Sequence, residues 1–408
     1  MDHVDVAVIG GGPAGLAAGR ELTRTGLEHL VLERARVGES WRGRWDSFRL
    51  VTPNWSTQLP GRGYDGSDPE GFMARDEVVA YLERYAGDLG ARVREGVEVG
   101  PLESRRGGGF VLGTSSGDLR ADAVVVATGT YRSSYRPAAA ATLPVDLLQL
   151  DVGDYRNERA LPPGRVLVVG SGQSGCQIAE ELHDAGREVF LACGKAPWAP
   201  RRLGGRDLIW WAAETGFLDM SAESLPTPAA RLGANVLATG HGGGRDLDLR
   251  TLRERGVTLT GHFLGAGNGR ARFASDLAES VAWGDERYEQ FMDLVRKLVA
   301  QRGLDLPEIV RPSPFDPTAP ESVDLAGFGA VLFAGGFRPD YGSLLPWPEA
   351  LDDLGFPHQR NGASTVIPGL YFLGVHFMRK RKSATLVGMG EDATVVAGLI
   401  EARLRAAA

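Results

Sequence analysis

Two sets of glycines in this chain of 408 residues are spaced in a way that can bind phosphate. The first set consists of Gly10, Gly12 and Gly15. It follows the β-branched run of residues 4–9 and opens the Ala- and Leu-rich stretch of residues 13–25, which predicts a strand, a G-x-G-x-x-G turn and a helix. The first glycine permits the tight turn, the second lets the backbone approach a pyrophosphate, and the third packs helix on strand. The next β run, residues 28–32, is followed by Glu33, whose carboxylate can accept hydrogen bonds from ribose hydroxyls. The segment therefore predicts a dinucleotide-binding unit.

The second set repeats this pattern further along the chain. It consists of Gly170, Gly172 and Gly175. It lies between a β run at residues 165–169 and a helical stretch at residues 176–185. The position that corresponds to Glu33 holds Cys193, and three cations follow it: Lys195, Arg201 and Arg202. Because cations accept a 2′-phosphate that an acid would repel, this unit is predicted to prefer NADPH to NADH. The alternative is that the cations belong to a solvated loop.

Composition restricts the possible functions. The chain has a net charge of −7, which argues against a nucleic-acid partner. No apolar run approaches the length of a membrane span, and no secretory signal is visible at the N-terminus, so a cytoplasmic protein is expected. The only cysteines are Cys176 and Cys193, too few for a disulfide scaffold and without metal-ligand spacing. Most of the 56 glycines need no functional explanation, since a GC-rich genome would produce such an excess of glycine.

A third glycine turn suggests how the chain is divided. A buried strand at residues 123–127 ends in Ala127, Thr128 and Gly129. The sequence here resembles the flavoproteins with two dinucleotide-binding domains, in which such a turn closes over FAD. Residues 333–336 are similar, with Gly335 where threonine is usual. The resemblance implies an α/β fold with two Rossmann-like dinucleotide-binding domains, the NADPH domain inserted into a split FAD domain. The expected boundaries are 1–136 and 320–408 for FAD and 137–319 for NADPH.

Longer motifs resemble the single-component flavin-dependent monooxygenases, which include flavin-containing and N-hydroxylating enzymes and bacterial short members. The similarity covers residues 38–61, 149–156, 205–211, 368–374 and 381–393. It implies that NADPH reduces FAD, that O2 adds at flavin C4a, and that bound NADP⁺ shelters the hydroperoxide. The disulfide-reductase branch is disfavoured because neither cysteine lies beside the expected flavin. Asn54 matches the family's asparagine beside the flavin; the alternative is a turn residue after Pro53.

The expected cofactor-binding residues follow from these motifs. For FAD they are Gly10, Gly12, Pro13, Ala14, Gly15, Glu33, Arg34, Ser40, Trp41, Val99, Ala127, Thr128 and Gly129. For NADPH they are Gly170, Ser171, Gly172, Gln173, Ser174, Gly175, Lys195, Arg201 and Arg202. No metal site is expected. Two groups of side chains remain open: the aromatics of residues 41–55 either line the flavin cavity or pack as core, and the basic run 379–382 is either a solvated face or neutralises cofactor charge.

One departure from the family bears on the reaction. Asp151 stands where the group signature before the second glycine turn has histidine, and Leu147 stands where it has glycine. We therefore expect N- or other soft-heteroatom oxygenation of a small organic substrate rather than Baeyer–Villiger insertion. An NADPH oxidase, a flavin dehydrogenase and a redox-sensing regulator remain alternatives. The expected partners are the substrate and O2, without nucleic acid or membrane, and a homodimer is an open alternative to a monomer.

Overall fold

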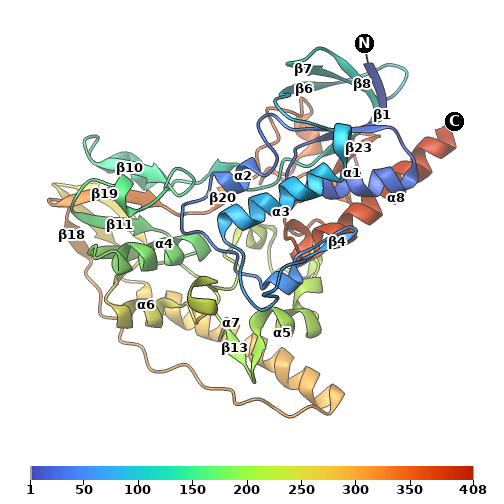
Figure 1. The fold of residues 1–408 in the computed structure, drawn as a ribbon. Coiled ribbons are helices and arrows are strands. Elements are labelled where there is room, and N and C mark those ends of the chain that lie inside the picture. Colours follow the sequence, from blue (N-terminus) through green and yellow to red (C-terminus); the bar gives the residue numbers. More distant parts are fainter. Residues whose placement is uncertain (1, 408) are drawn as a thin grey trace.

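Two sheets with parallel cores form the protein, and both ends of the chain contribute to the first of them (Figure 1). A computed structural model describes residues 2–407. The parallel strands of the first sheet are, in spatial order, β23 (Leu370–Phe372), β8 (Leu119–Val126), β1 (Asp2–Ile9), β2 (His29–Leu32) and β5 (Val93–Arg94). Antiparallel strands extend it: β6 (Val99–Ser104), β7 (Phe110–Thr114), β21 (Gln359–Arg360) and β22 (Ala363–Ser364). The predicted strands at residues 4–9 and 123–127 thus lie side by side as β1 and β8.

The second sheet is entirely parallel. Its strands are, in spatial order, β10 (Leu148–Asp151), β19 (Phe328–Phe333), β11 (Arg165–Val169), β12 (Val189–Ala192) and β15 (Thr258–Thr260). The interior of β11 is buried on both faces, as its run of β-branched and leucine residues predicts. A small antiparallel sheet packs against one face of it: β16 (Phe263–Gly267), β17 (Arg270–Phe273) and β18 (Ser322–Asp324).

Helices cover the sheets and place the two glycine turns. They are α1 (Pro13–Thr25), α2 (Glu39–Arg42), α3 (Arg75–Gly87), α4 (Gln173–Asp184), α5 (Leu208–Glu214), α6 (Leu249–Arg255), α7 (Leu277–Arg302) and α8 (Met389–Ala407). Pro13 begins α1, where its missing N–H costs nothing, and Gly26 ends the helix in the left-handed conformation. The helix of the second turn, α4, begins at Gln173, three residues before the predicted start. Both halves therefore have the predicted strand–turn–helix order.

The chain crosses between the sheets twice, and the crossings pair with each other. On the outward crossing β9 (Ser133–Ser134) pairs antiparallel with β20 (Phe337–Arg338) of the return crossing. The predicted boundary at residues 319/320 falls before β18 and β19, and β19 pairs with β10 and β11 of the second sheet. The chain thus leaves that sheet only after Phe333, because the run 328–333 completes its parallel core.

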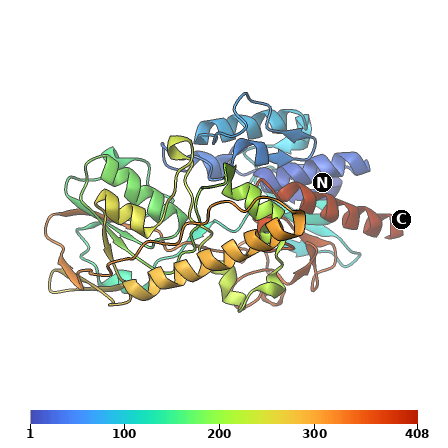
Figure 2. The same ribbon diagram turned by 90° about the horizontal axis from the view of Figure 1, so that it is seen from below.

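The long helix α7 runs across the underside of the molecule in Figure 2. Its apolar side chains pack against α5 and the segment around Trp198, and Trp198 stacks on Tyr288 with 4.6 Å between ring centroids. Trp211 is buried in the same cluster. Trp211 therefore belongs to the apolar core of this region, and Trp198 packs against it.

Candidate functional site

The first glycine turn has the geometry that its spacing predicts. Gly10 has a φ of 115°, and a Cβ there would lie 2.6 Å from the carbonyl oxygen of Ala127. A Cβ on Gly15 would overlap the carbonyl oxygen of Gly10. A Cβ on Gly12 would meet nothing within 4 Å, so this backbone faces open space at the start of α1. A pyrophosphate fits at this position, where helix N–H groups have no intrahelical partner.

The other predicted FAD residues lie around this turn. Pro13 and Ala14 are buried in the first turn of α1. Thr128 and Gly129 follow β8, and the backbone N–H of Thr128 would be 3.3 Å from a Cβ on Gly10. Val99 begins β6, two residues after Val97, whose N–H donates to the carbonyl of Glu33. Arg34 is exposed, and Ser40 and Trp41 lie on α2.

Glu33 lies next to the turn but is already hydrogen-bonded. One carboxylate oxygen accepts the N–H of Gly11 at 2.7 Å and the other accepts the N–H of Ala35 at 2.9 Å. Carboxylate oxygens have further lone pairs, so these bonds orient the acid and leave it able to accept from a ribose hydroxyl.

The second glycine turn repeats the first closely. Gly170 has a φ of 112°, and a Cβ on it would lie 2.5 Å from the carbonyl oxygen of Ala334. A Cβ on Gly175 would overlap the carbonyl oxygen of Gly170, whereas one on Gly172 would meet only Ala234, at 3.7 Å. The cradle at the start of α4 is therefore open as well, and a second dinucleotide fits there.

Two residues predicted to bind NADPH through this turn have other partners. The Oγ of Ser171 donates to the carbonyl of Gly194 at 3.0 Å and accepts its N–H at 2.9 Å. The side-chain amide of Gln173 donates to the carbonyl of Ala238 and accepts the N–H of that residue. Both side chains fasten the turn to neighbouring segments, and Ser174 is half-buried in the first turn of α4.

The three predicted phosphate-binding cations have different surroundings. Arg201 is only 2% exposed and forms an ion pair with Asp207 at 2.8 Å. Its guanidinium also donates to the carbonyl of Val51 at 2.7 Å, and burial and these partners withdraw it from solvent, which argues against the predicted contact with a 2′-phosphate. Arg202 is partly exposed and lies 3.5 Å from Glu70. Lys195 is exposed just after β12, on the side of the second turn, and remains a candidate.

The side chain of Asn54 forms hydrogen bonds with the backbone of the segment that follows it. Its side-chain N–H donates to the carbonyl of Asp68 at 2.9 Å, and its side-chain oxygen accepts the N–H of Met73 at 2.7 Å. The residue is 4% exposed. The geometry supports the alternative reading of a loop-forming residue and gives no support to a catalytic role.

The two remaining groups of side chains are also placed. Trp45 is buried and makes an edge contact with Phe48, whose ring also contacts Trp41, so these aromatics pack as core. The basic run 379–382 is not a solvated face. Arg379 pairs with the buried Asp392, and Lys380 and Lys382 each pair with Asp219 and Glu391.

A polar and aromatic cluster that the sequence analysis did not single out lies between the two turns. Tyr131 follows the turn after β8, and Phe337 follows the corresponding turn after β19; their rings meet edge to face at 5.7 Å. The hydroxyl of Tyr131 is hydrogen-bonded to Nε2 of His376, which follows β23. Burial lowers the pKa of His376 to about 4, so the imidazole is neutral at pH 7. The signal available in the sequence was an aromatic residue just after Gly129 and another just after Gly336.

Ligands in open α/β sheets bind at the carboxyl ends of the strands, and the cluster has this location. Tyr131, Phe337 and His376 follow the carboxyl ends of β8, β19 and β23, and the glycine turns follow those of β1 and β11. Gly374, two residues before His376, is so close to α1 that a Cβ on it would lie 2.9 Å from that of Ala14. The cluster therefore adjoins both cradles.

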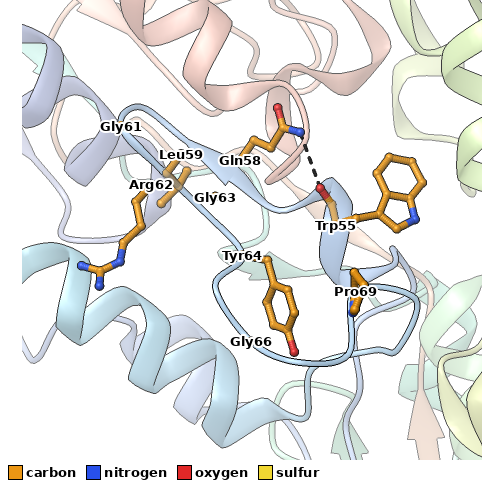
Figure 3. A pocket seen from close by; sticks show the side chains of 9 residues that line it. All are labelled: Trp55, Gln58, Leu59, Gly61, Arg62, Gly63, Tyr64, Gly66 and Pro69. Carbon is orange, nitrogen blue, oxygen red and sulfur yellow. Dashed lines mark hydrogen bonds between the residues drawn. The ribbon is translucent and has the colours of Figure 1, made fainter.

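A separate pocket of about 540 Å³ lies on the surface of the first half (Figure 3). Its wall is the hairpin of β3 (Gln58–Leu59) and β4 (Arg62–Gly63) with Trp55, Tyr64 and Pro69. The glycine turns do not line it. Trp55 thus belongs to this pocket and not to the aromatic core around Phe48.

Within residues 2–407 no group of three or more His, Cys, Asp or Glu side chains is arranged to hold a metal ion. No helix in this range is long and apolar enough to cross a membrane. Both cysteines are free and buried, and burial raises the pKa of each thiol.

Comparisons with known proteins agree with the geometry. Residues 7–204 match the family described as pyridine nucleotide-disulphide oxidoreductase. Over 396 residues the chain is 31% identical to a CzcO-like oxidoreductase of Geobacillus kaustophilus, covering 96% of this chain and 97% of that protein. The indole-3-pyruvate monooxygenase YUCCA4 of Oryza sativa subsp. japonica is 28% identical over 290 residues, 62% of this chain and 65% of the plant protein.

A solved structure extends the comparison to the whole fold. The flavin-containing monooxygenase from Stenotrophomonas maltophilia superposes with a TM-score of 0.70 at 22% sequence identity, covering 99% of this chain and 100% of that one. The predicted fold class, with two dinucleotide-binding domains, is confirmed. The chain therefore belongs to the CzcO-like oxidoreductases, and its similarity to flavin monooxygenases is consistent with the resemblance found in the sequence.

Proposed function

We propose that the protein uses NADPH and FAD to insert one oxygen atom of O2 into a small organic substrate, preferably at nitrogen or another soft heteroatom. The observation that carries this proposal is the Tyr131–Phe337 contact between the turns that follow β8 and β19. The turn after β8 packs against Gly10 and the turn after β19 packs against Gly170, so dinucleotides held in the two cradles would direct their reactive rings toward the same cluster.

The residues of this chain would bind and orient the cofactors. The open backbone at Gly12 would hold the FAD pyrophosphate, with Glu33 at its ribose, and the backbone at Gly172 would hold the NADPH pyrophosphate. Bound FAD supplies the redox and oxygen chemistry in enzymes of this kind. Tyr131, Phe337 and His376 would enclose the reacting groups and limit the access of water.

The first experiment is the anaerobic reduction of FAD-loaded protein by NADPH. We expect the flavin absorbance to bleach, and bleaching to be slower with NADH. A coupled screen should then follow NADPH consumption and product mass over amines, thioethers and ketones. An increase of one oxygen in an amine or thioether supports the proposal, and an ester formed from a ketone would indicate Baeyer–Villiger insertion instead. Protein that retains FAD but is not reduced by either nucleotide contradicts the proposal at its first step.

An NADPH oxidase is a second candidate, motivated by the loss of the family histidine at position 151. Asp151, at the position of the family histidine, pairs with Arg136 at 2.6 Å and so ties the outward crossing to β10. Replacing Asp151 by His and measuring hydrogen peroxide released per NADPH tests this reading. An oxidase releases one hydrogen peroxide per NADPH whichever compound of the screen is present. A monooxygenase releases less hydrogen peroxide per NADPH when its substrate is present.

A further inference from the structure

Within residues 2–407 Arg44 is a half-buried cation without an acidic partner. Its neighbour in the sequence, Arg42, pairs with Glu83 at 2.5 Å. Burial lowers the pKa of Arg44, and in the same range Tyr131 alone opposes this shift, with no carboxylate contributing. Partial loss of hydration without a nearby anion is unfavourable for a cation, so a ligand that supplies negative charge would stabilise this guanidinium.

Arg44 faces the cluster between the two cradles. Its guanidinium carbon lies 5.7 Å from the centre of the Phe337 ring, within the range of a cation–π contact. It is also close enough to Tyr131 that each residue influences the pKa of the other. The segment that carries it follows α2, so a fourth element reaches the place where strands of both sheets end.

Tyr131 is open to solvent at this place, with 44% of the residue exposed. Desolvation raises the pKa of Tyr131 to about 12, offset in part by Arg44 and by a hydrogen bond with Asn235. A ligand could therefore reach a surface that combines the guanidinium of Arg44 with the rings of Tyr131 and Phe337.

We propose that Arg44 binds the carboxylate of the substrate, which would be a small organic acid whose apolar part lies against Phe337 and Tyr131. The inference rests on the proposed function, because it places the substrate between the two cofactor sites. A guanidinium matches a carboxylate geometrically, and neutral His376 brings no competing charge. Each cradle has its own helix N-terminus for a pyrophosphate, so the cofactors do not require Arg44 for that purpose.

The test compares an acid with its uncharged analogue. Phenylacetate and phenylacetamide are titrated separately into oxidised, FAD-loaded protein without NADPH, by calorimetry and by perturbation of the flavin absorbance. We expect phenylacetate to bind wild type about tenfold or more tightly than the amide, the size of one charge-assisted pair. R44Q should abolish this preference, and R44K should restore part of it. Arg106→Gln, on the exposed β6–β7 hairpin, is the matched control and should keep the full preference.

Three outcomes would overturn the inference. One is equal binding, or no binding, of the two probes to wild type, which requires no variant to fold. Another is an unchanged acid preference in R44Q. The third combines two results: R44Q binds NADP⁺ about tenfold more weakly than wild type does, and wild type binds the acid and the amide equally. The group that pairs with Arg44 would then be a phosphate of the nucleotide. Because these titrations omit NADPH, failure of flavin reduction, which contradicts the proposed function, is recognised separately.

Discussion

Residues 33 and 193 occupy corresponding positions and show how each half fastens its glycine turn. In the first half the carboxylate of Glu33 accepts the N–H of Gly11, and a Cβ on Gly11 would lie 2.7 Å from that of Glu33. In the second half the acid is replaced by Cys193, and the hydroxyl of Ser171 bonds to the backbone of Gly194. The side chain that makes the hydrogen bond follows β2 in the first half and belongs to the glycine turn in the second half. The first turn has glycine at position 11 because Glu33 fills the space beside it, whereas the second turn, without an acid, accommodates the side chain of Ser171.

The third glycine of each turn gives a prediction at the residue scale. Gly15→Ala should abolish FAD retention, because the added methyl group overlaps the carbonyl of Gly10. Gly175→Ala should retain FAD but lose binding of the nicotinamide cofactor, since the same overlap then occurs in the second turn. Overpacking of this kind costs about 1–3 kcal/mol or more. Bound FAD is measured by absorbance after purification and NADP⁺ binding by calorimetry.

Gly398→Ala provides the control for both variants. Gly398 lies within α8, and a Cβ there would meet nothing within 4 Å. Alanine is the better helix former by about 1 kcal/mol, so this variant should bind both cofactors and melt no earlier than wild type. Normal FAD content in Gly15→Ala would show that the first turn is not the FAD cradle.

Lys195 is the exposed cation that remains for nucleotide selection. Lys195→Ala should lower kcat/KM for NADPH about tenfold and leave that for NADH nearly unchanged, because one charged hydrogen bond contributes about 1.5–3 kcal/mol. The comparison variant is Lys297→Ala on α7, far along the chain from the second turn. Equal losses with the two nucleotides would argue against a contact with the 2′-phosphate.

At the scale of elements, the local sequence predicts the parts that depend on short-range patterns. The run 165–169 coincides with β11, and the Pro13–Gly26 signals bound α1, because burial of a β-branched run and helix capping are local effects. The crossing after β19 was misplaced because its position depends on pairing with β10, far away in sequence. The glycine at position 335, where threonine is usual, is also explained by a contact distant in sequence. A Cβ there would lie 2.8 Å from the carbonyl oxygen of Tyr135, on the other crossing.

The candidate site also contains residues that local motifs predict and residues that only the tertiary fold brings together. The glycine turns and Glu33 are recognisable because their chemistry lies within one strand–turn–helix unit. The partner of Arg201 in the first half is Val51, 150 positions away, and no spacing rule connects them. Arg44 and Tyr131 are also far apart in sequence and meet only because four elements end at one place. Such contacts depend on the tertiary fold and were not accessible to motif analysis.

The basic run 379–382 forms ion pairs with acids at the start of α8, and its members should contribute unequally to the stability of the protein. Arg379→Met should destabilise the protein by about 3–5 kcal/mol, because it leaves Asp392, 1% exposed, as a buried charge without its partner. Lys382→Met should cost about 1 kcal/mol or less, since its partners Asp219 and Glu391 are partly exposed and are also paired with Lys380. Thermal melting of the FAD-loaded variants measures the difference. Equal shifts in the two variants would mean that burial of Asp392 does not decide the cost.

For the molecule as a whole, the contacts between the halves determine whether the two cradles stay aligned. The paired crossings β9 and β20 connect the sheets covalently, and Arg201 connects them through space. Its guanidinium lies 4.3 Å from the ring centre of Phe72, in addition to its bonds to Val51 and Asp207. Hydride transfer requires the cofactor rings to meet, so loosening this contact should slow flavin reduction without changing which nucleotide is preferred.

Arg201→Met tests this role against the phosphate-binding role that the sequence suggested. We expect a loss of about 3–5 kcal/mol, because the buried Asp207 loses its close partner and keeps only the longer ion pair with Arg202 at 3.7 Å. Arg201→Met/Asp207→Asn should recover part of the loss, since asparagine carries no charge and can still accept the N–H of Ile209 at the start of α5. Arg202→Met, at the adjacent and partly exposed position, should change melting little. The measurements are thermal melting and the ratio of flavin-reduction rates with NADPH and NADH. An Arg201→Met protein that melts normally but loses its preference for NADPH would restore the phosphate assignment and remove the inter-half contact as the reason for this arginine.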